Sequence, residues 1–272
     1  KIPLILLNAR ITKKTFNRWS KINFFSKLIF GMITVAYPQN LETKYFLKKI
    51  KTKKINRIGN LKFAEDPEEN FTIKNKKLKS ELNKNKIWVA SSTHKNEEIF
   101  CANAHKELKK KNKNLITIII PRHVHRANEI ALEMKKINLN VAYHSSKIRT
   151  LKNIDIYIVD TFGETKLFHK ISSTVFLGGS IIKRGGQNPL EAARLGSKIL
   201  HGPNTDNFKD VYKHLKLLNI SKKINTPLQL ASSIVFKKNK NSGKKIKKIG
   251  QKILNKTINE LDNLINNEFK KT

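Results

Sequence analysis

The residues best suited to chemistry lie in one glycine-rich stretch, Gly178 to Glu191, which reads GGSIIKRGGQNPLE. It follows a strand-like run at 173–177 and leads into a helix that we expect from about Asn188. Glycine lets the backbone approach a ligand closely, and a helix N-terminus presents N–H groups that favour an anion. We therefore predict a phosphate-binding turn, with the candidate residues Gly178, Gly179, Ser180, Arg184, Gly185 and Gly186. Neither a P-loop nor a dinucleotide fingerprint is present, so a turn that binds no ligand remains the alternative.

The end of this stretch has the composition of a helix start. Asn188 suits the N-cap, Pro189 suits the first helical turn, and Glu191 occupies the capping-box position. Two roles are therefore open to Glu191, as part of a cap and as a carboxylate that contacts a ligand.

The elements that would position these residues alternate between strand and helix. The sequence predicts strands at 87–91, 115–120, 139–143, 154–159, 173–177 and 198–201, and helices at 96–111, 125–137, 165–171, 188–195, 205–217 and 226–236. Such alternation is typical of a parallel sheet with helices on both faces. Ligands of these folds bind at the carboxyl ends of the strands.

Polar residues follow the predicted strands at those ends. Arg122 can pair with a phosphate, and Gly163 admits a close backbone approach. The other groups there are Ser92, Thr93, His94, Pro121, His123, Asp160, Thr161, Phe162, Glu164 and residues 202–205. A nucleotide-like anion is the simplest ligand for this set.

Two further clusters lead to plainer interpretations. Glu97 and Glu98 fall in a first helical turn, where acidic residues ordinarily offset the helix dipole. His123 and His125 lack a third ligand with suitable spacing, so we predict no metal site. The single cysteine, Cys101, fits a core position and a reducing compartment.

The chain has 272 residues and a formal net charge of +36, most of it from lysine. Such charge attracts an anionic partner, either nucleic acid or acidic lipid. Few arginines and no interleaved aromatic platform are present, which disfavours specific nucleic-acid binding. Lys, Asn and Ile are abundant and all have A/T-rich codons, so compositional drift is an alternative source of the charge.

The N-terminal part is less regular. Residues 15–33 mix aromatic and basic side chains and predict an amphipathic helix or helix pair. Because the periodicity is poor, we favour a core-facing helix over a surface that meets lipid head groups. No apolar run reaches the roughly 20 residues of a membrane span. The chain begins at Lys1 without a Met, and we expect it to be a piece of a longer protein.

Several short motifs follow one another along the chain: NAR at 8–10, GNLKF at 59–63, SSTHKNEE at 91–98, PRH at 121–123, DTFGE at 160–164, GGS followed by RGGQNPLE at 178–191, and GPNTDNF at 202–208. Taken together, they resemble the motifs of bacterial transferases of 3-deoxy-D-manno-octulosonic acid (Kdo). The resemblance implies an α/β fold of the GT-B class, with a complete C-terminal Rossmann-like domain and the end of an N-terminal domain. It implies the end of an acceptor domain at 1–65, a connection at 66–86, a donor-binding domain at 87–242 and a C-terminal helix at 243–272.

The same resemblance implies an inverting glycosyltransferase that moves Kdo from CMP-Kdo to a lipid A precursor in lipopolysaccharide biosynthesis, with no cofactor. CMP would be held by Pro121, Arg122, Phe162, Gly163, Glu164, Asn188, Pro189, Leu190 and Glu191, with the Glu191 carboxylate on the ribose hydroxyls. Lys62 matches a lysine that steadies charge in the transition state. The family's catalytic carboxylate, in a motif like S-V-G-E, has no counterpart here, so the fragment alone is expected to be inactive. The partners would include the anionic cytoplasmic face of a bacterial inner membrane, met peripherally or through an N-terminal anchor.

The chain departs from the family pattern at a few positions, where Asn96 replaces a usual Gly and Gln187 replaces a usual His. Val124 and His125 stand for Pro-Glu, and Asn204 and Asp206 also differ. Two alternatives stay open, namely another sugar-nucleotide GT-B transferase or epimerase and a basic nucleic-acid-binding protein.

Overall fold

The computed structural model describes residues 2–64, 75–146 and 150–269. The chain divides into two compact units, one formed from 1–66 together with 246–272 and the other from 67–245. The larger unit carries the sheet predicted from the sequence, and the smaller one carries two short parallel strands with their helices. We describe each unit by itself.

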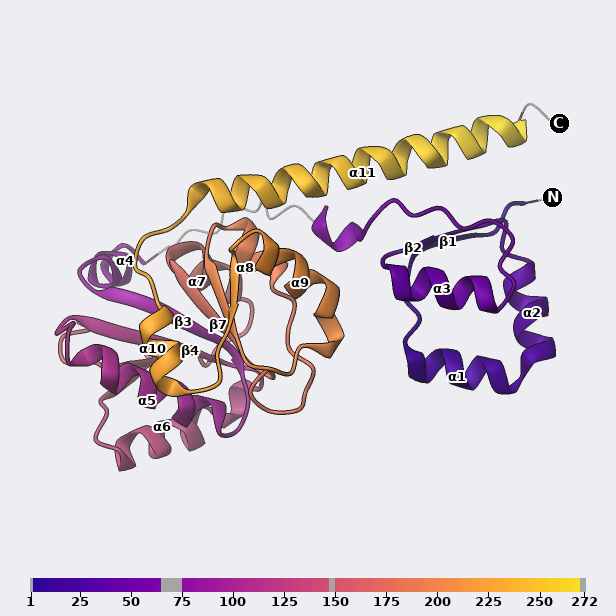
Figure 1. The fold of residues 1–272 in the computed structure, drawn as a ribbon. Helices are drawn as coiled ribbons and strands as arrows, with labels where there is room; N and C mark the ends of the chain where they lie inside the picture. Colours follow the sequence, from indigo (N-terminus) through magenta and orange to yellow (C-terminus); the bar gives the residue numbers. More distant parts are fainter. Residues whose placement is uncertain (1, 65–74, 147–149, 270–272) are drawn as a thin grey trace. The chain divides into compact units, whose positions relative to one another are not determined.

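The larger unit is built on a seven-stranded sheet in which every pairing is parallel (Figure 1). Its spatial order is β5-β6-β4-β3-β7-β8-β9. The strands are β3 (Lys86–Thr93), β4 (Leu115–Pro121), β5 (Val141–Tyr143), β6 (Ile156–Ile158), β7 (Thr174–Leu177), β8 (Lys198–His201) and β9 (Ser221–Lys223). The six strands predicted from the sequence are confirmed.

Helices cover both faces of this sheet. One face carries α5 (Glu97–Lys109), α6 (Ala127–Lys136) and α10 (Pro227–Ser233), and the other carries α7 (Thr165–Ile171), α8 (Leu190–Arg194) and α9 (Lys209–Leu217) (Figure 1). The central strands are apolar on both faces because both are covered. Trp88, Ile119, Ile130 and Met134 are buried in the core under α5 and α6, and Cys101 is fully buried as predicted.

The topology defines one reversal point. From β3 the chain crosses to β4 on one side, whereas from β7 it crosses to β8 on the other side. The loops that follow the neighbouring strands β3 and β7 therefore run in opposite directions across the sheet. In open α/β sheets, the ligand crevice lies at such a point.

Three local predictions differ from the structure. The edge strand β9 was not predicted, because its sequence SKK is polar and only Ser221 is buried. The predicted connection at 66–86 contains a helix, α4 (Lys76–Asn83), whose N-cap Asn75 accepts hydrogen bonds from the N–H groups of Lys77 and Leu78. Residues 66–74 of that connection lie outside the described residues. The helix predicted at 205–217 is a 3-10 turn, Asp206–Phe208, followed by α9.

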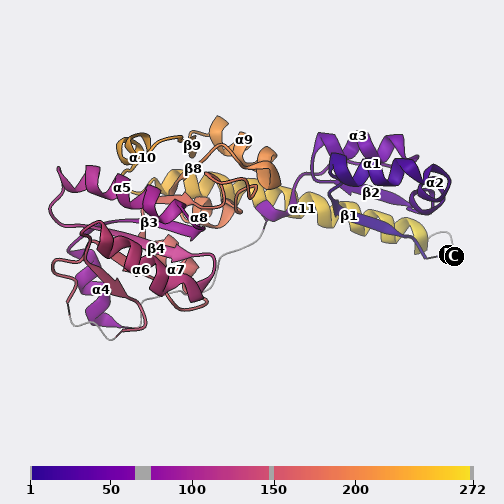
Figure 2. The same ribbon diagram turned by 90° about the horizontal axis from the view of Figure 1, so that it is seen from below.

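The smaller unit pairs β1 (Ile5–Ala9) with β2 (Val35–Pro38) in parallel. Its helices are α1 (Lys13–Lys21), α2 (Asn23–Gly31) and α3 (Leu41–Lys49), so residues 15–33 form the helix-pair alternative. The long helix α11 (Lys240–Phe269) contributes its later residues, which run alongside β1 (Figure 2). Its Glu260 accepts hydrogen bonds from the Tyr37 hydroxyl at 3.4 Å and the Asn56 amide at 3.3 Å.

The preference for a core-facing helix at 15–33 is wrong for α2. Only Ser26 and Phe30 of α2 are buried, and Phe30 packs with Ala36 and Leu47. The other large apolar side chains, Phe24, Phe25, Leu28 and Ile29, are exposed, as is Met32 just after the helix. Among the described residues, none of the helices combines the length and the apolar character that crossing a membrane requires.

Candidate functional site at the carboxyl ends of the strands

A buried carboxylate organises the reversal point between β3 and β7. Glu97 is fully buried at the start of α5 and accepts hydrogen bonds from the backbone N–H groups of Gly179 (2.6 Å), Ser180 (3.0 Å) and Ile181 (2.9 Å). The N–H of His94 donates a fourth bond at 3.0 Å. A carboxylate held by several backbone N–H groups is a strong acceptor site, so Glu97 fixes the turn after β7 against the turn after β3.

These contacts correct two predictions. Glu97 is not an ordinary first-turn acid, since it is an internal anion bound by the glycine turn. The N–H groups that the phosphate prediction assigned to a ligand at Gly179 and Ser180 already have this partner. Of the other glycines, Gly186 donates to the Gly179 carbonyl, and the Gly185 carbonyl accepts from Asn207. Gly178 serves close packing, because a Cβ there would lie 2.3 Å from the Ser92 carbonyl oxygen.

The neighbouring Glu98 is also fully buried and is not a surface acid. Its carboxylate pairs with the guanidinium of Arg126 at 2.7 Å, which joins the start of α5 to the start of α6. Burial raises the pKa of Glu98, and the Arg126 hydrogen bond opposes that rise. Breaking a buried pair of this kind leaves an uncompensated charge, so we assign it to the fold.

The backbone explains one departure from the family pattern. Asn96 stands where glycine is usual, and its φ of 77° lies in the left-handed region. Asparagine adopts this region more readily than other residues with a side chain. The turn that delivers Glu97 is therefore preserved without glycine.

Glu191 lies at the start of α8, and its carboxylate is not used as a cap. The helix begins at Leu190, and the Asn188 side chain accepts a hydrogen bond from the Leu190 N–H at 3.2 Å. The Glu191 carboxylate instead accepts a bond from Nδ1 of His169 at 2.8 Å. The capping-box interpretation of Glu191 is therefore wrong, and the helix predicted from 188 starts two residues later because Asn188 and Pro189 form the entry turn.

His169 in turn contacts β3, since its Nε2 lies 3.0 Å from the Ser91 hydroxyl. His169 and Ser91 are buried, whereas the Glu191 side chain keeps 29% of its surface exposed. Burial alone would raise the pKa of Glu191, but the His169 hydrogen bond and the nearby cations Lys166 and Arg194 lower it. Glu191 is thus an ionised acceptor at neutral pH that solvent can reach.

The other predicted nucleotide contacts follow neighbouring strands at the same edge. Pro121 ends β4 and is buried, while Arg122 follows it with an exposed side chain. Phe162 and Gly163 lie in the turn after β6; Phe162 is 83% exposed and Gly163 has a φ of 86° with open space around its Cα. Glu164 ends that turn, and its carboxylate is 4.0 Å from Nε2 of His144. The buried residues Pro189 and Leu190 start α8 next to Glu191.

Lys62 lies in the smaller unit, in a 3-10 turn at Leu61–Phe63. The Leu61 N–H donates to the Asn8 side chain at 3.2 Å, so two of the family-like motifs, NAR and GNLKF, meet in space. Asn60 accepts a bond from the Lys62 N–H at 3.0 Å. This geometry supports a structural coupling of the two motifs around Lys62.

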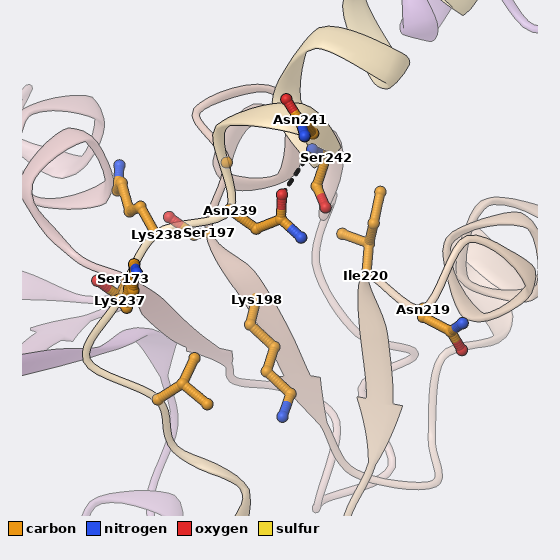
Figure 3. Close-up of a pocket in the computed structure, with 12 residues that line it drawn as sticks. Ser173, Ser197, Lys198, Asn219, Ile220, Lys237, Lys238, Asn239, Asn241 and Ser242 are labelled. Atoms are coloured by element: carbon orange, nitrogen blue, oxygen red, sulfur yellow. Dashed lines mark hydrogen bonds between the residues drawn. The ribbon is translucent and has the colours of Figure 1, made fainter.

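A pocket of about 730 Å³ lies at the opposite edge of the sheet, beside the starts of β7 and β8 (Figure 3). Its lining includes Lys198 and Lys238. The Lys198 amine donates to the Ser233 carbonyl, and the Lys238 amine donates to the carbonyls of Lys170 (2.6 Å), Leu195 (3.0 Å) and His169 (3.2 Å). A third lysine, Lys237, also lines the pocket and is exposed, but the amines of Lys198 and Lys238 are engaged with carbonyl groups, and we assign no ligand to this pocket.

Sequence reasoning missed Ser91, His169 and the structural role of Glu97. An acidic residue directly after a strand and its turn was the available signal for Glu97. His169 carried no local signal, since its partners are 78 and 22 residues away. Within the described ranges, no group of three or more His, Cys, Asp or Glu side chains is arranged to hold a metal ion.

Comparisons with known proteins relate both units of the chain to 3-deoxy-D-manno-octulosonic acid transferases. Residues 1–65 match the family model described as 3-deoxy-D-manno-octulosonic-acid transferase (kdotransferase). The chain is 30% identical over 217 residues to the 3-deoxy-D-manno-octulosonic acid transferase of Haemophilus influenzae, covering 79% of this chain and 51% of that protein. It is 32% identical over 247 residues to the enzyme of the same name from Rickettsia prowazekii, covering 90% and 53%. The chain spans about half the length of the relatives it matches.

Solved structures agree on the fold. The C-terminal CMP-Kdo binding domain of WaaA from Acinetobacter baumannii superimposes with a TM-score of 0.53 at 23% identity, covering 64% of this chain and 91% of that domain. A UDP-forming trehalose-phosphate synthase from Burkholderia xenovorans gives 0.53 at 8% identity, covering 93% and 65%. The predicted GT-B fold and the resemblance carried by the motifs are both confirmed.

Proposed function

We propose that this chain, a relative of the 3-deoxy-D-manno-octulosonic acid transferases, binds CMP-Kdo at the carboxyl ends of its parallel strands. The observation that carries the proposal is that the loops after β4, β6 and β7 and the start of α8 all lie at the carboxyl ends of parallel strands, on either side of the reversal point. These loops bring an exposed cation, an exposed aromatic ring and an ionised acceptor, in the form of Arg122, Phe162 and Glu191. A nucleotide offers a phosphate, a base and ribose hydroxyls, which match these three groups.

The proposed reaction of the whole protein is transfer of Kdo to a lipid A precursor with inversion at the anomeric carbon. An acceptor hydroxyl would attack that carbon while CMP leaves, and Arg122 would stabilise the charge on the leaving phosphate. Lys62 is proposed to steady charge in the transition state. Neither Lys62 nor Arg122 can take the acceptor's proton, because lysine and arginine are ordinarily cationic near neutral pH. The general base would therefore be another group, and no residue of this chain is assigned to that role.

Nucleotide selectivity tests the donor site. Calorimetric titration of the 272-residue chain with CMP, UMP, UDP and ATP should give the highest affinity for CMP. Arg122→Ala should weaken CMP binding by about tenfold or more, because it removes a charged hydrogen-bond donor. Lys113→Ala is the matched control, since Lys113 is an exposed cation before β4 at the other edge of the sheet. A preference for UDP would favour another sugar-nucleotide transferase, and no binding of any nucleotide would refute the site.

We further propose that α1 and α2 meet the anionic cytoplasmic face of a bacterial inner membrane. The exposed Phe24, Phe25 and Leu28 of α2 form an apolar surface that adjoins the exposed cations Lys21 and Lys27. An apolar surface flanked by cations fits the boundary between acyl chains and acidic head groups. This placement would bring the chain to a lipid acceptor.

Vesicle binding tests this surface. The parent chain should bind phosphatidylglycerol vesicles at low salt and bind phosphatidylcholine vesicles weakly, with binding that falls as salt screens the charge. Replacing Phe24 and Phe25 by Ser should reduce binding, whereas the control, Leu132 and Leu228 replaced by Ser, removes exposed leucines of the larger unit and should not. Equal losses in the two variants would contradict the proposal. Saturable, sequence-dependent binding to duplex DNA at physiological salt would favour the nucleic-acid alternative.

A further inference from the structure

His169, in α7, joins β3 to α8 through hydrogen bonds on both ring nitrogens. Nδ1 lies 2.8 Å from Glu191 Oε1, and Nε2 lies 3.0 Å from Ser91 Oγ. The imidazole is buried, with 4% of its side chain exposed. Its two contacts are therefore fixed by packing.

The chemistry of the partners sets the direction of both bonds. An ionised carboxylate can only accept, so Nδ1 carries a hydrogen and donates it to Glu191. In the neutral imidazole the other nitrogen is then an acceptor, and the Ser91 hydroxyl donates to Nε2. The Glu191 carboxylate thus selects the tautomer with the hydrogen on Nδ1, and the Ser91 hydroxyl, which can donate or accept, fits it by donating to Nε2.

The order serine, histidine and carboxylate is that of a hydrolytic triad, but this arrangement does not suit nucleophilic attack. Ser91 is 1% exposed, within β3, so a substrate carbonyl cannot reach its hydroxyl. Glu191, at the opposite end of the chain of bonds, is the member that solvent reaches. We therefore consider what the two hydrogen bonds of His169 do to the accessible Glu191 carboxylate.

We propose that His169 is a positioning residue, held by Ser91, that orients the Glu191 carboxylate to accept hydrogen bonds from the ribose hydroxyls of the bound nucleotide. The inference rests on the proposed CMP site. One oxygen, Oε1, is occupied by His169, which restricts the carboxylate, and 29% of the Glu191 side chain stays exposed. A free glutamate side chain has several rotamers, and ordering it on binding weakens affinity. His169 provides that order before the nucleotide arrives.

Two substitutions distinguish the contributions of the two ring nitrogens of His169. His169→Asn keeps an amide donor near the position of Nδ1, whereas His169→Gln places its amide near Nε2 and leaves Glu191 unheld. The control is the same pair of changes at His105, a fully buried histidine that contacts Asp155 and Thr117. Each variant is titrated with CMP and with 2′,3′-dideoxy-CMP, at a temperature where circular dichroism shows it folded.

The parent should bind CMP more tightly than dideoxy-CMP, because only CMP offers hydroxyls to Glu191. His169→Gln should weaken CMP binding by about tenfold and leave dideoxy-CMP unchanged, while His169→Asn should stay within about threefold of the parent for both. The variants at His105 should lower thermal stability without changing the ratio of the two affinities.

Equal losses for both nucleotides in His169→Gln, or equal affinities in the Asn and Gln variants, would overturn the positioning role while leaving the CMP site standing. A parent that binds CMP and dideoxy-CMP equally would also overturn it, because Glu191 would then not contact the ribose. A parent that binds neither nucleotide would refute the proposed function, and the inference with it.

Discussion

Two of the sets of hydroxyl, imidazole and carboxylate in the described part of the larger unit share their chemistry and differ in their surroundings. In the first set, at the amino ends of the strands, His105 bonds Thr117 Oγ1 at 2.8 Å and lies 3.4 Å from Asp155 Oδ1. In the second, at the carboxyl ends, His169 joins Ser91 to Glu191. We refer to them as the Asp155 set and the Glu191 set.

The carboxylates distinguish the two sets. Asp155 receives the Lys109 amine at 3.0 Å on Oδ1 and the Asn140 N–H at 3.0 Å on Oδ2, so protein groups hold both oxygens, and 12% of its side chain is exposed. Glu191 is held by His169 through Oε1, and 29% of its side chain is exposed. The comparison teaches that the same three groups stabilise the fold where the carboxylate is enclosed and can serve a ligand where it stays accessible.

The largest expected effect is a loss of stability on removing the carboxylate charge of the Asp155 set. Asp155→Asn removes the charge that Lys109 and His105 contact, and should lower the free energy of unfolding by about 2–3 kcal/mol. Glu191→Gln should change it by less than about 1 kcal/mol, since its carboxylate is partly solvated. Urea titration of both variants measures the difference, and an equal loss in the two would remove the distinction between the sets.

The Asp155 set should also contribute most to the loss of stability at acidic pH. Burial alone would raise the pKa of Asp155, but hydrogen bonds from His105, the Asn140 N–H and Lys109 outweigh it and hold the pKa well below its usual 3.8. A lowered folded pKa gives stability that is present above the ordinary value and is lost as pH falls through the folded value. Below about pH 4, the parent should therefore lose stability more steeply than Asp155→Asn, as thermal melts across pH would show; parallel curves would contradict this cause.

A smaller effect on stability is expected from Lys238, whose amine donates a hydrogen bond to the backbone carbonyl of His169 in the Glu191 set. Its amine binds carbonyls at the ends of α7 and α8, the helices that carry His169 and Glu191. Lys238→Met should lower the free energy of unfolding by about 1 kcal/mol at pH 7 and leave CMP affinity within about twofold. Lys237→Met, at an exposed neighbour, is the control.

The pH dependence of this loss has a defined sign. Burial lowers the pKa of Lys238 to about 8 from an ordinary 10.5, so between these values the unfolded chain binds more protons than the folded one. The parent should therefore gain stability relative to Lys238→Met as pH rises from about 8 towards 10.5. If the stability difference between the parent and Lys238→Met instead narrows over this pH range, the amine is not held in its buried position.

The sequence was most informative where local pattern and global fold agree. Alternating apolar runs predicted the central strands, and the glycine-rich stretch marked the reversal point, because both depend on neighbouring residues. The role of Glu97 could not be predicted, since three of its four N–H donors come from a turn more than 80 residues away. Glu191 was recognised as a ligand candidate, but its support by His169 depends on the packing of α7 against α8, which no spacing in the chain records. The exposed face of α2 was misjudged because its apolar content resembles that of a core helix.

The most direct test is a calorimetric titration of CMP into Glu191→Gln and Asp155→Asn at a temperature where both variants are folded. Gln is nearly isosteric with Glu but replaces one acceptor oxygen by a donor, so the ribose hydroxyls would lose an ionised partner. The expected result is about tenfold weaker binding by Glu191→Gln and unchanged binding by Asp155→Asn, although the second variant is the less stable of the two. Parental affinity in Glu191→Gln, or a matching loss in Asp155→Asn, would contradict the assignment of the accessible carboxylate to the nucleotide.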